Sequence, residues 1–371
     1  MRNLQKHRKI TQNMIPLYQH YNNLQDTIPH VALGNWPSPV YPVDSLSNAL
    51  NIKSLHIKCD GRSGPLYGGN KVRKLEFIFG HVLKRNISSV FTLCTIGTHH
   101  GLATSLYGKS IGLNTELIQT YQPVNQHVRD QILAIASSGA KTRLINNTSL
   151  ALIYITGRRL LNALHLSGSK EYYIPPGGSS VYGALGFVNA AYELAQQINE
   201  GLCPKPDIIY IPFSTVGTYT GLWLGMALAG LKCKIIGVRV AEPILSNKLR
   251  VRMLAFAVLK VLRKACGHSF PYSHINRPIY IDHNHVGQGY GHSTEKADDA
   301  IKLIKSHTDL SLEPVYTGKT LAALIADASS GQLKDKHVLF WNTYNQLPLD
   351  DLISSTSPDD LSPSFQTYFN S

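Results

Sequence analysis

Lys71 follows a glycine-rich loop and begins a predicted helix, a placement that suits a nucleophilic amine. Asn70 is expected to cap this helix, which the apolar spacing predicts over 71–83. The positive end of a helix disfavours an ammonium group, so we expect a lowered pKa for Lys71. A neutral amine attacks an aldehyde to form a Schiff base. The local pattern alone favours an ordinary surface lysine, and Lys74, one turn further on, is a competing nucleophile.

A second segment, Ser214 to Gly221, follows the apolar strand predicted over 207–213 and opens another helix. The backbone N–H groups of such a turn, with the hydroxyls of Thr215 and Thr218, suit a phosphate group. The segment lacks the lysine of a P-loop and the glycine pattern of a dinucleotide fold, so a small monophosphate is favoured over a nucleotide. An ordinary strand-to-helix turn is an equally good interpretation.

Two further turns could contact a ligand. In the turn Gly97 to Gly101, Thr98 and the following N–H groups could hold a carboxylate. His99 and His100 could transfer protons near neutral pH, although capping or packing histidines are common at such turns. The glycines of Pro175 to Ser180 allow a ligand to approach the backbone closely, and a tight connection explains them equally well.

Composition excludes several classes of protein. The chain has 371 residues, of which 43% are hydrophobic and 16% charged, so it can fill a sizeable core and is not disordered. The positive charges behind the net charge of +13 are scattered and form no nucleic-acid-binding motif, and no segment could span a membrane. We therefore expect neither nucleic acid nor a membrane as a partner. The five cysteines are far apart, which fits the reducing cytoplasm. Asp282 to His285 lacks a third ligand, so no metal is expected.

The alternation of strands and helices predicts an α/β fold with parallel sheets flanked by helices. We expect two lobes with a ligand between them, at the carboxyl ends of the strands. The amphipathic run 251–262 is expected to face the core rather than a membrane. The predicted division is a loosely ordered basic lead-in over 1–30, a large lobe over 31–84 and 181–350, a small lobe over 85–180, and a poorly ordered tail over 351–371.

Several segments, in this order and spacing, resemble the family of 1-aminocyclopropane-1-carboxylate deaminases and D-cysteine desulfhydrases. The resemblance covers roughly residues 32 to 348. It is carried by Gly34 to Val40, Gly68 to Phe77, Pro175 to Phe187, Gly217 to Leu222, Gly287 to Gly291 and Pro314 to Lys319. The resemblance implies a pyridoxal-phosphate enzyme of the tryptophan-synthase-β-like class, called fold type II, which acts on a small amino acid as a homodimer.

The resemblance also implies roles for particular residues. Lys71, rather than Lys74, matches the Schiff-base lysine, and Asn70 lies beside it in the cofactor site. Thr98 matches a serine that binds the substrate and is proposed as a nucleophile or base, and Tyr316 matches an active-site tyrosine. The remaining assignments place the cofactor in the larger lobe and the substrate in the smaller lobe. The cofactor phosphate would be bound by Thr215, Val216, Gly217 and Thr218, and the pyridine nitrogen by Thr343. The substrate would contact Thr98, His99, His100 and Gly101.

Some positions depart from the family pattern. His99 stands where an asparagine usually contacts the 3-hydroxyl group of the cofactor. A tyrosine implicated in cyclopropane ring opening falls near Phe340, and Cys59 to Gly61 stands where Arg-Asp-Asp is usual. These departures favour α,β-elimination from D-cysteine or a similar amino acid, which gives a 2-oxo acid and ammonia. Ring opening as a deaminase, racemisation, and cofactor binding without catalysis remain alternatives.

Overall fold

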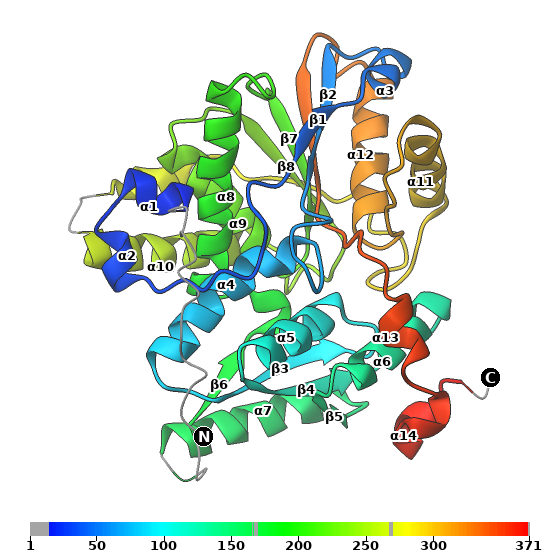
Figure 1. The fold of residues 1–371 in the computed structure, drawn as a ribbon. Coiled ribbons are helices and arrows are strands. Elements are labelled where there is room, and N and C mark those ends of the chain that lie inside the picture. The colour runs from blue at the N-terminus through cyan, green and yellow to red at the C-terminus, as the bar shows by residue number, and fades with distance from the viewer. Residues whose placement is uncertain (1–14, 165, 167–169, 267–269, 370–371) are drawn as a thin grey trace.

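Two β-sheets organise the protein (Figure 1). The computed structural model describes residues 15–369, apart from 165, 167–169 and 267–269. The larger sheet has six strands, and all neighbours are parallel except the antiparallel pair β1 and β2. Its order is β1 (Val40–Pro42), β2 (Ser54–Cys59), β10 (His337–Asn342), β7 (Ile208–Phe213), β8 (Lys234–Arg239) and β9 (Tyr280–Asp282).

The smaller sheet is entirely parallel and comes from one continuous stretch of the chain. Its four strands are, in order, β5 (Lys141–Leu144), β4 (Asn114–Thr120), β3 (Ser89–Thr95) and β6 (Glu171–Ile174). The predicted α/β fold with two parallel sheets is therefore confirmed. The boundaries at residues 84 and 180 stay a prediction.

Helices cover both faces of each sheet (Figure 1). One face of the larger sheet packs on α8, α9 and α10, and the other on α3, α11 and α12. In the smaller sheet, α5 and α6 lie on one face and α7 on the other. The helices are α3 (Asp44–Ala49), α4 (Asn70–Lys84), α5 (His99–Ser110), α6 (Gln126–Ser137), α7 (Thr148–Ala163), α8 (Val181–Asn199), α9 (Gly217–Leu228), α10 (Lys248–Cys266), α11 (Glu295–His307) and α12 (Thr317–Ser329).

The alternation of side chains along each strand explains this two-sided packing. In β7, Ile209 and Ile211 contact the core under α8 and α9, whereas Ile208 and Tyr210 contact the core under α12. Every residue of β7 is buried, so both faces of this central strand are apolar. A strand of this kind needs helices on both sides, and the fold supplies them.

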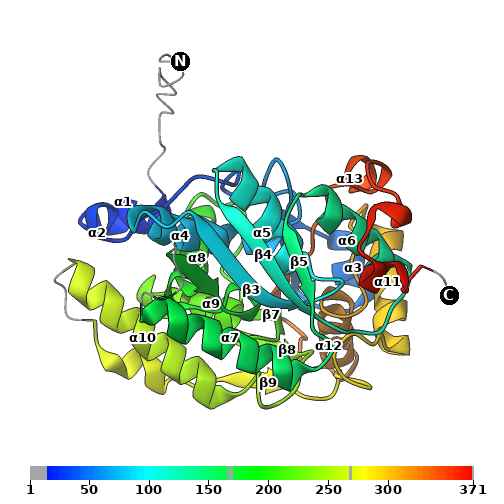
Figure 2. The same cartoon turned by 90° about the horizontal axis from the view of Figure 1, so that it is seen from below.

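Short helices lie near both ends of the described chain, in segments that the sequence predicts to be loosely ordered. Near the N-terminus, α1 (Pro16–His20) and α2 (Leu24–Thr27) pack on α8 and α10, with Leu17 and Leu24 fully buried. Residues 1–14 of the predicted lead-in lie outside the described chain. At the other end, α13 (Asp350–Ser354) lies beside α6 in both views (Figures 1 and 2), and α14 (Pro363–Gln366) buries Phe365. The predicted poorly ordered tail is therefore wrong, because its few apolar side chains suffice to anchor it.

The amphipathic run in α10 faces the core, as predicted. Val251, Ala255 and Val258 are completely buried against the larger lobe. None of the helices that the structure describes is long and apolar enough to cross a membrane.

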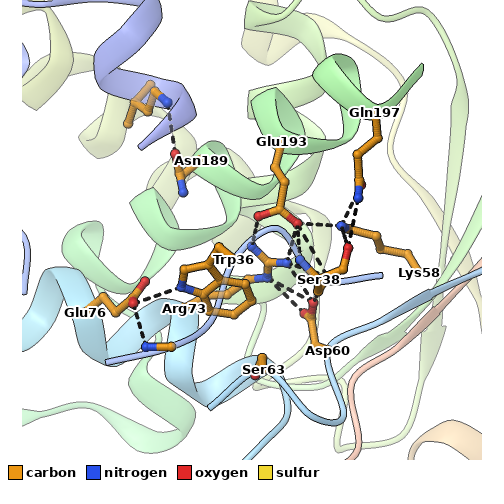
Figure 3. A network of polar contacts seen from close by, with 12 residues as sticks. Trp36, Ser38, Lys58, Asp60, Ser63, Arg73, Glu76, Asn189, Glu193 and Gln197 are labelled. Carbon is orange, nitrogen blue, oxygen red and sulfur yellow. Dashed lines mark hydrogen bonds and ion pairs between the residues drawn. The ribbon is translucent and has the colours of Figure 1, made fainter. Parts of the chain in front are cut away.

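A cluster of four buried charges joins α4 to the larger sheet (Figure 3). Arg73 of α4 is 1% exposed and lies between two carboxylates. Its Nη2 is 2.8 Å from Asp60 Oδ1, and its Nη1 is 2.9 Å from Glu193 Oε2 of α8. Lys58 of β2 also donates to Glu193 and to the Gln197 amide oxygen. Two cations and two anions balance, so the cluster fixes the start of α4 without leaving a net buried charge.

We expect Glu193→Gln to destabilise the fold by about 3–5 kcal/mol, because Arg73 and Lys58 would lose the charge that compensates them. Burial alone would raise the pKa of Glu193, but Arg73 and Lys58 hold it at about 2. This carboxylate therefore stabilises the fold above pH 4.5, the ordinary pKa, and that contribution is lost as the pH falls towards 2.

Urea unfolding measured from pH 7 to pH 3 tests this expectation. The exposed residue Glu200, which follows the same helix, supplies the control substitution Glu200→Gln. Equal stability of the two variants, or an unchanged acid dependence in Glu193→Gln, would contradict the role given to the cluster.

Candidate active site

A cavity of about 380 Å³ lies where the carboxyl ends of strands from both sheets meet. Its wall includes Thr95 at the end of β3, Ser214 after β7 and Thr343 after β10. Nearly all of the predicted site residues line it, namely Asn70, Lys71, Thr98, His99, His100, Thr215, Val216, Gly217, Thr218, Tyr316 and Thr343. Gly101 is the exception, because it is absent from the wall and its N–H donates to Thr98 Oγ1 over 3.0 Å.

Lys71 offers an unpaired amine to this cavity. It lies in the first turn of α4, as predicted, and no hydrogen bond or ion pair of its side chain occurs among the described residues. Burial lowers its pKa to about 8. The predicted cap is wrong, because Gly69 is the N-cap with φ of 88° and Asn70 is the first helical residue. The Asn70 side chain instead donates to Thr218 Oγ1 over 3.2 Å, which links α4 to α9.

Lys74, the competing nucleophile, has a structural contact. It is 2% exposed, and its Nζ donates to the carbonyl oxygen of Gly177 over 2.9 Å. Burial, followed by the charge of Lys71, holds its pKa well below the ordinary value. Lys74 therefore supports the Pro-Pro-Gly-Gly loop, and Lys71 is the better placed of the two amines.

The turn before α9 has the geometry of an anion site. Val216 takes a left-handed conformation with φ of 61°, which is strained for a β-branched residue and is typical of functional turns. Ser179 Oγ donates to Thr215 Oγ1 over 2.8 Å and accepts from Gly217 N over 3.2 Å. The early N–H groups of α9 lie at the positive end of the helix, and they find no partner inside it.

These residues fit pyridoxal phosphate. A Cβ atom on Gly217 would lie 2.6 Å from Ser179 Oγ, and one on Gly177 would lie 2.5 Å from Thr215 Oγ1, so both glycines are needed for the close packing of the turn. The turn supplies hydroxyls and helix-end N–H groups for a phosphate, and Lys71 supplies a neutral amine for an aldehyde.

A second helix end faces the cavity at α5. Thr98 is its N-cap, and the Thr98 hydroxyl, which lines the cavity beside the Cys94 thiol, accepts from Gly101 N. His100 is 4% exposed and lies within hydrogen-bond distance of Thr92 Oγ1, at 3.2 Å, and of Thr104 Oγ1, at 3.5 Å. Its side chain is therefore a packing histidine rather than a free acid or base.

His99 has protein partners on both ring nitrogens. Its Nδ1 is hydrogen-bonded to the hydroxyl of Tyr67, and its Nε2 lies 3.1 Å from Nε2 of His127. Burial, then the charges of His127 and Lys71, hold the pKa of His99 well below its ordinary value. Sequence reasoning missed Tyr67 and His127, since His127 is 28 residues from His99 and belongs to no recognisable motif.

Two tyrosines meet in the wall of the cavity. Tyr316 donates to the Tyr290 hydroxyl over 2.7 Å, and both rings line the cavity. Burial raises the pKa of Tyr316 well above its usual range, so its hydroxyl stays protonated. Tyr290 was missed, although it lies within the Gly287 to Gly291 segment of the resemblance. Phe340 is fully buried in β10 and does not line the cavity, so the missing hydroxyl predicted there has no bearing on the substrate.

The segment considered for a metal contains an ion pair. His285 Nδ1 lies 2.8 Å from Asp282 Oδ1. In the described part of the chain, no group of three or more His, Cys, Asp or Glu side chains could hold a metal ion.

The two-lobed fold and the amine opposite a helix-end anion site define a pyridoxal-phosphate enzyme of fold type II. The model of the family described as pyridoxal-phosphate dependent enzyme matches residues 31–343, and the chain belongs to this family. The predicted cofactor, pyridoxal phosphate, is thereby confirmed.

Individual relatives confirm the predicted resemblance. A protein of Pyrococcus abyssi named "Putative 1-aminocyclopropane-1-carboxylate deaminase" is 29% identical over 322 residues, which cover 86% of this chain and 92% of that protein. A D-cysteine desulfhydrase of Salmonella choleraesuis is 28% identical over 325 residues, covering 85% and 93%. A crystal structure of an ACC deaminase homologue superposes with a TM-score of 0.74 at 26% identity, covering 89% of this chain and 97% of that one.

Gly177→Ala is expected to weaken binding of pyridoxal phosphate by about 1–3 kcal/mol, because the new Cβ would press on Thr215 and φ at this position is +62°. Fluorescence titration of the apoprotein with pyridoxal phosphate measures the effect. The control is Gly157→Ala in α7, where a Cβ meets nothing within 4 Å. That substitution should leave cofactor binding unchanged and stabilise the helix by about 0.5–1 kcal/mol. Equal cofactor affinity in the two variants would refute the role of the loop.

Proposed function

We propose that the enzyme catalyses α,β-elimination from D-cysteine or a similar small amino acid, giving a 2-oxo acid and ammonia. The observation that carries this proposal is the position of the unpaired Lys71 amine, in one cavity with the Thr98 hydroxyl and the anion-binding turn before α9. The D-cysteine desulfhydrase relative, of which 93% is covered, supports the substrate class.

In this proposal Lys71 carries the cofactor and then exchanges the α-proton of the substrate. A pKa of about 8 suits an amine that must gain and lose a proton near neutral pH. The residues Thr215 to Thr218 would hold the cofactor phosphate, with Asn70 fixing Thr218, and Thr343 would contact the pyridine nitrogen. The bound cofactor withdraws electrons from the α-carbon and so makes the α-proton removable.

The start of α5 would bind the substrate carboxylate. The Thr98 hydroxyl lines the cavity, and the N–H groups of His99 and His100 lie in the first turn of the helix, where intrahelical partners are absent. Tyr316 lines the same cavity as a protonated hydroxyl that donates to Tyr290, so its oxygen could accept a hydrogen bond from the substrate. The contribution of Gly101 would be indirect, because its N–H orients Thr98.

Ring opening of 1-aminocyclopropane-1-carboxylate is the second candidate. The Pyrococcus abyssi relative supports it, and the hydroxyls of Tyr290 and Tyr316 in the cavity wall replace the one considered missing at Phe340. Assays of both compounds with the same preparation distinguish the two. Release of sulfide from D-cysteine supports elimination, whereas release of 2-oxobutanoate from the cyclopropane alone supports ring opening.

Lys71→Ala should lower the turnover of D-cysteine by about 10²-fold or more, because the variant lacks the proposed proton carrier. It should also abolish the covalent attachment of pyridoxal phosphate that borohydride reduction traps on the wild-type chain. Lys74→Met is the matched control, since it removes a neighbouring amine that is held by Gly177. Peptide mass mapping after reduction should find the cofactor on residue 71 in wild type and in Lys74→Met. Cofactor trapped on residue 74, or turnover retained in Lys71→Ala, would overturn the assignment.

We also propose a cytoplasmic homodimer. The five cysteines are all free, which fits a reducing compartment. Apolar side chains are exposed at helical spacing on two long helices, a pattern typical of surfaces that pair with a second copy. They are Leu150, Ile153, Leu160 and Leu161 along α7, with Leu164 at its C-cap, and Leu249, Met253 and Phe256 along α10. Light scattering that gives the mass of a single chain, 41.0 kDa, would contradict the dimer.

A further inference from the structure

We propose that Tyr67, His99 and His127 form a proton relay that delivers a proton from solvent to the departing group of the substrate. The inference rests on the proposed elimination and extends it, since it assigns the acid for the second half of that reaction. It is carried by an unbroken hydrogen-bonded chain along the cavity wall, from the Tyr67 hydroxyl through both nitrogens of His99 to His127.

The two histidines can share only one proton between their facing nitrogens. Because Nε2 of His99 faces Nε2 of His127 at 3.1 Å, one must donate and the other must accept. Burial lowers the pKa of both rings, and the charge of Lys71 lowers that of His99 further, so both rings are neutral near pH 7. In a neutral imidazole one nitrogen carries the hydrogen and the other does not, so the direction of one bond fixes the direction of the next.

The relay of Tyr67, His99 and His127 therefore has two arrangements of its protons, which differ by a concerted shift. In the first, Nδ1–H of His99 donates to the Tyr67 oxygen and Nε2–H of His127 donates to His99. When Tyr67 gives its proton to the substrate, His99 passes its Nδ1 proton to Tyr67, His127 passes its Nε2 proton to His99, and His127 takes a proton from water on Nδ1. One proton enters at His127, one leaves at Tyr67, and no residue of the chain becomes charged.

The two ends of the chain suit this direction of transfer. Tyr67 is 1% exposed, and its backbone is held by two hydrogen bonds with the Tyr107 hydroxyl, so its phenol has a fixed place near Lys71. His127 is only partly buried and lies at the start of α6, beside the exposed residues Asn125 and Gln126. His127, which is partly buried and lines the cavity, is therefore the end at which a proton from solvent can enter the relay.

Packing keeps the rings in line. The Tyr344 ring stands at 88° to His99 with centroids 5.4 Å apart and also contacts His127. The Gln131 side chain, fully buried one turn along α6 from His127, lies near the Tyr67 hydroxyl. The side chain of Asn125 accepts from Val128 N and so caps the helix that carries His127.

The departing group decides whether the relay is needed. A thiolate that leaves D-cysteine is a base and gains from a proton, whereas the chloride that leaves β-chloro-D-alanine needs none. His127→Gln keeps a polar side chain but breaks the relay. We expect it to reduce kcat for D-cysteine by about 10²-fold and to leave kcat for β-chloro-D-alanine nearly unchanged. Tyr67→Phe should show the same selectivity.

The capping variant Asn125→Ala is the structural control, because it loosens the same turn of α6 without removing any of the three relay residues. It should change kcat for the two substrates by a common factor. A common factor in His127→Gln, or undiminished turnover of D-cysteine, would overturn the relay while leaving the elimination intact. A wild-type enzyme that turns over neither compound would instead remove the proposed elimination.

A measurement without substrate tests the hydrogen-bonded relay itself. Proton NMR with ¹⁵N-labelled histidine should show two imidazole N–H signals, from His99 Nδ1 and His127 Nε2, shifted downfield and protected from solvent exchange in the wild type. Both signals should disappear in His99→Asn, the His127 signal should disappear in His127→Gln, and both should persist in Asn125→Ala. Two separately exchanging histidines in the wild type would refute the shared proton and with it the relay.

Discussion

The fold depends on the neutralisation of one buried guanidinium. Arg73 has no access to water, so without Asp60 and Glu193 its charge would be prohibitively costly inside the protein. Asp60 follows β2, Glu193 lies in α8, and Arg73 lies two residues after Lys71. The ion pairs therefore hold a strand, the helix behind it and the first turn of α4 in one arrangement. The Lys71 amine, two residues before Arg73 in the same helix, therefore takes its position from this cluster.

Two helix N-termini then divide the binding of an anionic ligand between them. The turn before α9 belongs to the larger sheet and offers a site for a phosphate, and the start of α5 belongs to the smaller sheet and offers one for a carboxylate. Lys71 lines the same cavity, and burial lowers its pKa to about 8. The glycine-rich loop at Gly177 links α4 to the turn before α9, since it contacts both Lys74 and Thr215. A ligand with one anion at each end thus spans both lobes.

Local sequence patterns predict this arrangement well where one turn contains all of the chemistry. The strand-to-helix turns at Thr98 and Thr215 are examples, and the alternation of elements predicts both sheets. The amine at Lys71 was identified by the resemblance, because its local pattern alone favours an ordinary surface lysine. Non-local contacts could not be predicted in this way. His127 and Tyr67 meet His99 only through the packing of α6 and of the loop before α4. The prediction that Asn70 caps α4 is wrong because Gly69, with its positive φ, is the N-cap residue. The Asn70 side chain can therefore donate to Thr218. The amphipathic α11 was overlooked, and the tail was judged by its polar composition although Leu361 and Phe365 anchor it.

The central claim, that the Lys71 amine and the turn before α9 bind pyridoxal phosphate for chemistry on an amino acid, is tested most directly by visible absorption. The purified protein is titrated with pyridoxal phosphate and then with D-cysteine, its enantiomer and other small amino acids. The account predicts a visible band that forms with the cofactor and changes with one or a few of the amino acids. A band that no amino acid changes would contradict catalysis, and the absence of any band would contradict the site itself.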